Sequence, residues 1–153
     1  MTDIERRIAI LEDIEAIRRL KLKYARLCDT GYDADALAAL FTEDAVWDAG
    51  DLGSVRGRAE IRAYWQQTAE NVPFAVHYIS NHTVDVAPDG STASGTCYLW
   101  QPMTMNGQAL WAAVVYDERY VKQAGDWLFE EMRLTTRMLT PYEEGWVKQP
   151  MAG

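Results

Sequence analysis

The only two histidines of the chain, His77 and His82, lie in one apolar stretch, residues 74–86. Its β-branched and aromatic residues predict a strand. Successive side chains of a strand point to opposite faces, so His77 should share a face with Asn81 while His82 points the other way. An inward-facing imidazole titrates near neutral pH and is a candidate general base. The alternative for His77 is a core histidine that hydrogen-bonds a neighbour.

Two further residues could complete a proton-transfer site. Asp29 ends a predicted helix, where a carboxylate is unfavourable because the last carbonyls already carry negative charge. This suggests a partner elsewhere, such as an imidazole, although Asp29 could instead bond the backbone of its own turn. Tyr24 lies on the apolar face of the same helix, and its hydroxyl could act as an acid or an oxyanion donor, or serve only the core. Together with His77, these residues would form a coherent proton-transfer set.

Other chemistries lack their motifs in this sequence. There is no Gly-x-Ser-x-Gly, no phosphate-binding loop and no Gly-x-Gly-x-x-Gly. We expect no metal, because two histidines on opposite faces of a strand cannot share one ion. Cys28 and Cys97 are too few for a disulfide framework and are expected to be buried, reduced thiols. Proton abstraction without metal, nucleotide or other cofactor remains.

The composition and net charge of the chain limit the classes of molecule that it could bind. The chain is 48% apolar and has a net charge of −8, with no basic patch. Nucleic acid and anionic membranes are therefore unlikely partners, and a small neutral or apolar ligand is expected. The start of the chain has no apolar signal-peptide core, and no run approaches the ~18 apolar residues of a membrane-spanning helix, which makes a cytoplasmic protein the default expectation.

The order of elements predicts one α+β domain over residues 1–153. Apolar residues at steps of three and four predict a helix over 4–27, with Gly31 beyond its end, then helices over 34–41 and 59–70 flanking a small hairpin at 45–56. Four antiparallel strands should follow, at 74–86, 92–105, 108–122 and 127–139. A long twisted sheet curls, so the three N-terminal helices could close it into a cone with a pocket on the concave face.

Several segments resemble the SnoaL-like branch of the nuclear transport factor 2-like superfamily. They are Asp13-Ile-Glu-Ala-Ile17, Tyr24-Ala-Arg-Leu-Cys-Asp29, Asp35–Ala45, Gly57–Ile61, Val76-His-Tyr-Ile-Ser-Asn81, Tyr116–Val121 and Gly125-Asp-Trp127. Within this branch the chain is similar to bile-acid 7α-dehydratase and hexachlorocyclohexane dehydrochlorinase, and more distantly to scytalone dehydratase. The resemblance implies a base pair of His77 and Asp29, with Tyr24 in the site. Gln101 stands where the bile-acid enzyme has a further catalytic aspartate, so no acid role is expected there.

The resemblance implies a lyase that acts on a hydrophobic cyclic or aromatic small molecule by elimination or by retro-aldol C–C cleavage. An isomerase or aldol-type cyclase would share the first step, and a non-catalytic ligand-binding or partner subunit is the other alternative. The substrate-binding candidates, chosen for their aromatic, thioether or amide side chains, are Trp47, Trp65, Asn81, Trp100, Gln101, Met103, Trp111 and Met138. A homo-oligomer is expected because Trp127 and Phe129 should lie on the outer face of the sheet, and the resemblance favours a trimer before a dimer.

Overall fold

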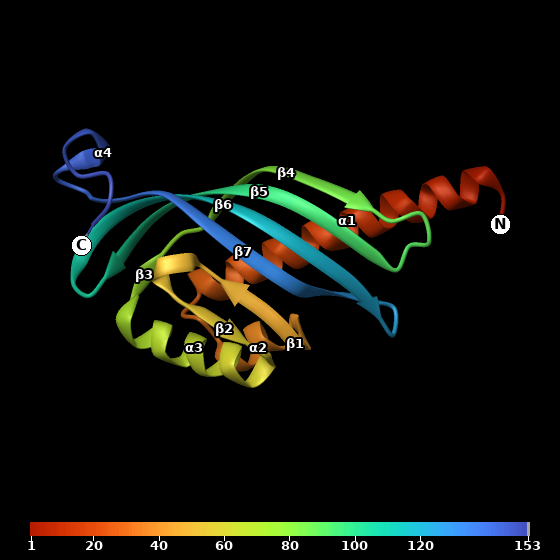
Figure 1. The fold of residues 1–153 in the computed structure, drawn as a ribbon, viewed down its shortest axis with the longest axis horizontal. Helices are drawn as coiled ribbons and strands as arrows, with labels where there is room; N and C mark the ends of the chain where they lie inside the picture. Colours follow the sequence, from red (N-terminus) through yellow and green to blue (C-terminus); the bar gives the residue numbers. More distant parts are fainter. Residues whose placement is uncertain (153) are drawn as a thin grey trace.

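A computed structural model describes residues 1–152 of the chain (Figure 1). The elements are α1 (Asp3–Asp29), α2 (Ala34–Ala38), β1 (Phe41–Asp48), the short 3-10 helix η1 (Gly50–Leu52), β2 (Ser54–Arg56), α3 (Arg58–Asn71), β3 (Phe74–Ala75), β4 (Tyr78–Val86), β5 (Thr92–Met105), β6 (Gln108–Gln123), β7 (Asp126–Pro141) and α4 (Gly145–Lys148). Most predicted elements are present within a few residues of their expected bounds. The strand predicted over 74–86 is instead split into β3 and β4. His77 lies in the short break between them.

The strands form one curved sheet that packs over the helices. Its order is β2-β1-β7-β6-β5-β3, and β4 also pairs with β5. The long strands β4 to β7 arch over α1, while α2, α3 and the β1–β2 hairpin lie below them (Figure 1). The sheet is antiparallel except where β1 runs parallel to β7. This arrangement confirms the α+β cone, and the β1–β7 pairing attaches the small hairpin to the main sheet.

Helix α1 begins and ends as its sequence predicts. Thr2 and Glu5 form a capping box at the start. At the end, the Tyr32 N–H donates to the Leu27 carbonyl at 3.0 Å, and Gly31 has φ +104°. These features form a Schellman motif, in which a left-handed residue after the helix satisfies the last carbonyls. The cap therefore fixes the backbone conformation at the end of α1, and with it the positions of Asp29 and Tyr32.

The predicted polar and apolar faces of α1 need two corrections. Ile4, Ile8 and Leu11 are exposed, because this end of the helix extends beyond the sheet (Figure 1). Lys21, which the spacing of the apolar residues along this helix would place on its polar face, is fully buried and binds Glu118 of β6 at 2.5 Å. Its ammonium also lies over the Tyr116 ring, 3.3 Å from the ring centroid. A buried ammonium needs a paired anion, and the amphipathic pattern alone gave no sign of Glu118, 97 residues further along the chain.

The two histidines do not point to opposite sides of the sheet. Between Ser80 and Thr83 the register of β4 with β5 shifts by one residue, and Asn81 has a left-handed φ of +53°. Such a β-bulge inserts an extra residue and reverses which residues face inward. After the bulge His82 is half-buried and Thr83 exposed, which is the reverse of an uninterrupted strand.

None of the helices within residues 1–152 combines the length and the apolar character needed to cross a membrane.

Candidate active site

His77 lies in the break between β3 and β4, directly opposite the end of α1. Its ring Nδ1 is 2.6 Å from Asp29 Oδ1, and its backbone N–H donates to the same oxygen at 2.9 Å. The imidazole is almost fully buried and the Asp29 side chain is partly exposed. Asp29 therefore has the kind of partner that its position at a helix C-terminus suggested, the imidazole of His77. The same carboxylate oxygen fixes both the main chain and the ring of His77.

The second ring nitrogen of His77 faces Gln101 of β5. The Gln101 Nε2 atom is 3.3 Å from His77 Nε2. With a proton on Nδ1 donated to Asp29, His77 Nε2 is left as an acceptor, and the Gln101 amide can donate to it. In this tautomer the lone pair of His77 Nε2 is directed away from Asp29, where a substrate C–H could replace the Gln101 contact, as a general base requires.

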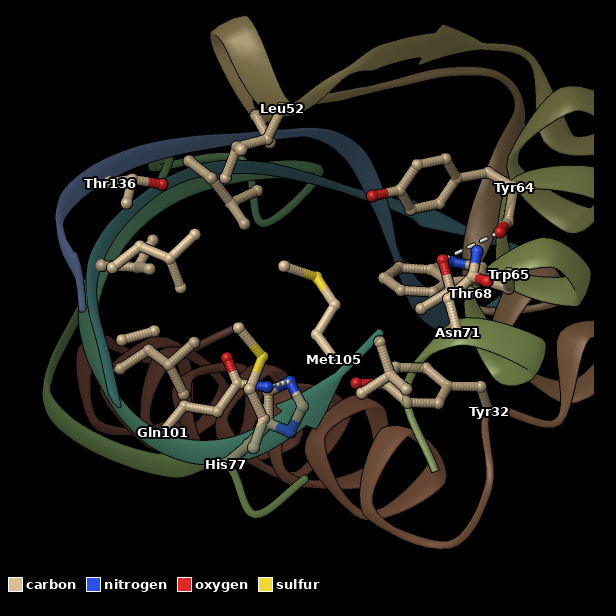
Figure 2. Close-up of a pocket in the computed structure, with 18 of the residues that line it drawn as sticks. Tyr32, Leu52, Tyr64, Trp65, Thr68, Asn71, His77, Gln101, Met105 and Thr136 are labelled. Atoms are coloured by element: carbon tan, nitrogen blue, oxygen red, sulfur yellow. Dashed lines mark hydrogen bonds between the residues drawn. The ribbon is translucent and has the colours of Figure 1, made fainter. Parts of the chain in front are cut away.

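This end of His77 opens into a cavity of about 280 Å³ between the concave face of the sheet and α3. Figure 2 shows His77 and Gln101 side by side on one wall, with Tyr64, Trp65, Thr68 and Asn71 across the space from them. Apart from His77, the lining residues are apolar, aromatic or neutral amides and hydroxyls. Within the described part of the chain, none of them carries a carboxylate, an ammonium or a guanidinium group. The cavity therefore suits an uncharged molecule of one or two rings.

Five of the predicted side chains besides His77 line this cavity: Tyr24, Trp47, Trp65, Gln101 and Met103. Tyr24 is deeply buried, with its ring packed edge-on against Phe41, Trp65 and Phe129. Burial raises the pKa of the Tyr24 hydroxyl well above its usual value. Tyr24 is thus a neutral hydrogen-bond donor rather than a phenolate.

Four predicted substrate-binding residues lie outside the cavity lining and need correction. Trp100 and Trp111 stack on each other at 5.3 Å on the outer face of the sheet, since their neighbours Leu99 and Gln101 take the inward positions. Asn81 is exposed at the bulge. Met138 follows a register shift in β7, so Thr136 and Leu139 line the cavity instead. In each case the register of the strands decides the direction.

Sequence reasoning missed Tyr32, Tyr64 and Tyr116, which also line the cavity. Tyr32 carried a usable signal, because it follows Gly31 directly at the predicted end of the first helix. Tyr116 alternates in β6 with exposed Asp117, so its inward direction follows once the facing side is known.

A second cluster of polar side chains lies beyond the cavity lining, between α1 and the sheet. Donor atoms of His82, Cys97 and Glu118 are all within 4.8 Å of one another, a spacing that a metal ion could bridge. Both Glu118 oxygens are already engaged, one by the Lys21 ammonium and the other by the Tyr120 hydroxyl. Burial raises the pKa of the Cys97 thiol to about 12. The bound ammonium and the protonated thiol make this cluster a buried ion pair rather than a metal centre.

The fold and this site define a cone-shaped α+β domain of the nuclear transport factor 2-like class. Residues 9–133 match the model of the SnoaL-like domain, and the chain belongs to that family. No curated protein matches the chain in sequence.

Solved structures with the same fold cover most of the chain. A candidate aromatic ring hydroxylase of Novosphingobium aromaticivorans is 30% identical, with 86% of this chain and 94% of that one covered and a TM-score of 0.78. A candidate scytalone dehydratase of the same organism is 23% identical, with coverage of 88% and 90% and a TM-score of 0.79. The hexachlorocyclohexane dehydrochlorinase of Novosphingobium barchaimii is 20% identical, with coverage of 88% and 92% and a TM-score of 0.78.

Proposed function

We propose that this protein is a cofactor-independent lyase that acts on a neutral, hydrophobic cyclic or aromatic small molecule. The observation that carries the proposal is the 2.6 Å contact between Asp29 and His77 Nδ1, which leaves His77 Nε2 toward the cavity. A buried imidazole held by a carboxylate is a competent base near neutral pH.

In the proposed elimination, His77 Nε2 takes a proton from a substrate carbon. The electrons of the broken C–H bond form a double bond, and the leaving group on the neighbouring carbon departs with its bonding pair. The Asp29 carboxylate stabilises the imidazolium that forms, and Tyr24 donates a hydrogen bond to developing negative charge. In a retro-aldol reaction His77 would instead take the proton of a hydroxyl, whose electrons form a new carbonyl. The adjacent C–C bond breaks, and its electron pair leaves as the enolate of a neighbouring carbonyl, which the imidazolium then protonates.

The cavity supports an uncharged substrate. Trp47, Trp65 and Met103 supply an apolar wall, and the neutral amide of Gln101 replaces the second carboxylate that the resemblance implies for bile-acid dehydration. A substrate carboxylate would find no cation among the lining residues of the described chain, so its burial would be costly.

The relatives support the same class and one alternative. Two structural neighbours are described as a dehydratase and a dehydrochlorinase, both of which are eliminating enzymes. The 30% identical neighbour is described as an aromatic ring hydroxylase, which favours an accessory role in ring oxidation as a second candidate function. An isomerase or an aldol-type cyclase shares the first proton transfer.

The base is tested with 5-nitrobenzisoxazole, a neutral bicyclic aromatic whose single reactive C–H is lost as the N–O bond breaks. We expect the wild-type protein to accelerate its ring opening and His77→Ala to lower kcat by about 10²-fold or more. His82→Ala is the matched control and should keep the wild-type rate. Equal rates in wild type and His77→Ala would show that His77 is not the base and would favour the accessory role.

The reaction class is tested with 3-hydroxy-1-indanone, a neutral β-hydroxyketone, in deuterated water. A lyase should release water and form indenone at a rate that depends on His77. Deuterium exchange at the carbon next to the carbonyl without loss of water would contradict the lyase assignment and favour an isomerase-type reaction.

A further inference from the structure

Tyr32 is held in an unusual backbone conformation next to the candidate base. Its φ is +56°, in the left-handed region that residues other than glycine rarely adopt. Its N–H closes the helix cap by donating to Leu27, so the cap enforces this conformation. Strained backbone of this kind often occurs at functional sites, where the surrounding structure maintains it. The conformation directs the side chain from the end of α1 into the cavity.

The ring of Tyr32 is fixed by two aromatic neighbours. It stacks on Trp65 with the ring centroids 5.6 Å apart and the planes 16° apart. It meets His77 edge-on, at 6.4 Å between centroids. Figure 2 shows its hydroxyl directed into the open space beside His77 and Gln101. The hydroxyl is therefore held within reach of a molecule that also contacts His77.

The hydroxyl is available as a neutral donor. Burial raises the pKa of Tyr32 well above its usual value, and the neighbouring Gln101 amide opposes this only in part. The Tyr24 ring, by contrast, packs against Phe41, Trp65 and Phe129 and not against His77. Of these two tyrosines, Tyr32 is the closer neighbour of the base.

We propose that Tyr32 is a catalytic residue that donates a hydrogen bond to an oxygen of the substrate while His77 removes the proton. The substrate then carries a carbonyl, hydroxyl or ether oxygen within a few bonds of the reacting C–H. Tyr32 keeps its proton throughout and stabilises the negative charge that develops on that oxygen. This inference rests on the proposed base function of His77, and its test is arranged so that the two can fail separately.

The first arm of the test is kinetic and uses 5-nitrobenzisoxazole, whose ring opening leaves negative charge on an oxygen. Tyr32→Phe retains the ring and its stacking and removes only the hydroxyl. We expect kcat to fall by roughly tenfold or more with little change in KM, as for the loss of a transition-state donor. Tyr98→Phe, an exposed tyrosine on the outer face of β5, is the matched control and should keep the wild-type kcat.

The second arm measures binding and does not depend on activity. The probes are 1-indanone, which has one acceptor oxygen, and indane, the same bicycle without it, followed by tryptophan fluorescence. Tyr32→Phe should weaken 1-indanone binding up to about tenfold and leave indane binding unchanged, because only the ketone loses a hydrogen bond.

The outcomes separate the two proposals. Equal losses for the ketone and the hydrocarbon, or a kinetic loss in Tyr24→Phe and none in Tyr32→Phe, would overturn the role of Tyr32. So would failure of the wild-type protein to bind 1-indanone more tightly than indane. Tyr32→Phe could weaken binding of 1-indanone alone while His77→Ala keeps the wild-type rate. That result would support the contact between Tyr32 and the ligand oxygen and reject His77 as the base.

Discussion

A single carboxylate oxygen of Asp29 holds the candidate base in place. It accepts the backbone N–H of His77 and lies 2.6 Å from the ring Nδ1. The backbone bond anchors the irregular segment between β3 and β4, and the ring contact selects the tautomer. Asp29 thus has a structural task and a proposed chemical one, which substitutions can separate.

Asp29→Asn should lower kcat on 5-nitrobenzisoxazole while the fold is retained. The asparagine Oδ1 can still accept both bonds, but it carries no charge to stabilise an imidazolium, so we expect a loss on the order of 10²-fold. Circular dichroism and thermal unfolding should stay close to wild type. Wild-type kcat in Asp29→Asn would show that the pair is structural only.

The stability of the protein should depend on the ionisation of His82. Burial lowers the pKa of His82, with a smaller opposing effect from Glu118 and further lowering from Lys21 and Arg18. The unfolded chain therefore binds the proton first as pH falls, and stability is lost below about 6.5, levelling off under the folded pKa. Thermal unfolding between pH 8 and 5 should show a smaller decrease in Tm for His82→Gln than for wild type. Parallel curves would contradict this.

At the scale of elements, one irregular point orients side chains of the candidate site and another orients the buried cluster beside it. The Schellman motif at the end of α1 directs Asp29 and Tyr32 toward the cavity. The bulge at Asn81 in β4 turns His82 toward Cys97 and Glu118. Both points use a left-handed backbone conformation at a residue other than glycine, which links local strain to where the side chains lie.

The bulge predicts a specific pattern of stability changes. Asn81→Val places a β-branched residue at φ +53° and should lower the free energy of unfolding by about 1–3 kcal/mol. Asn81→Gly should be neutral or slightly stabilising at this position. Ser80→Val, one residue earlier in regular exposed strand, is the control and should change little. Chemical denaturation measures all three, and equal effects at positions 80 and 81 would argue against the bulge.

At the scale of the whole molecule, several large apolar side chains are exposed on the surface. The oligomer expectation was based on Trp127 and Phe129 as exposed residues. Both are buried, so the prediction that they lie on the outer face was wrong. The outer face of the sheet instead presents Tyr98 and Trp100, with Trp146 of α4 packed edge-on against Trp100. The protruding start of α1 adds further exposed aliphatic side chains. Exposed apolar patches of this kind are typical of interaction surfaces.

A homo-oligomer, with a trimer expected before a dimer, stays a prediction on these grounds. Light scattering at micromolar concentration should give a mass above the 17.4 kDa of one chain. Trp100→Glu should shift the mass toward the monomer without changing the fold, because it places a charge on the exposed aromatic face. A monomeric wild-type protein would refute the expectation.

The sequence by itself determined the class of fold and the identity of the central pair. Hydrophobic periodicity and turn residues predicted the helices and long strands because each pattern reports local burial. His77 stood out as one of two histidines on a predicted strand and Asp29 as a carboxylate at a helix end, and the family resemblance favoured pairing them. The tertiary structure decided directions and partners. A one-residue bulge turned His82 inward, strand register excluded Trp100, Trp111 and Met138, and Lys21 met Glu118 in the core. Register and long-range pairing depend on contacts between distant segments, which no local pattern encodes.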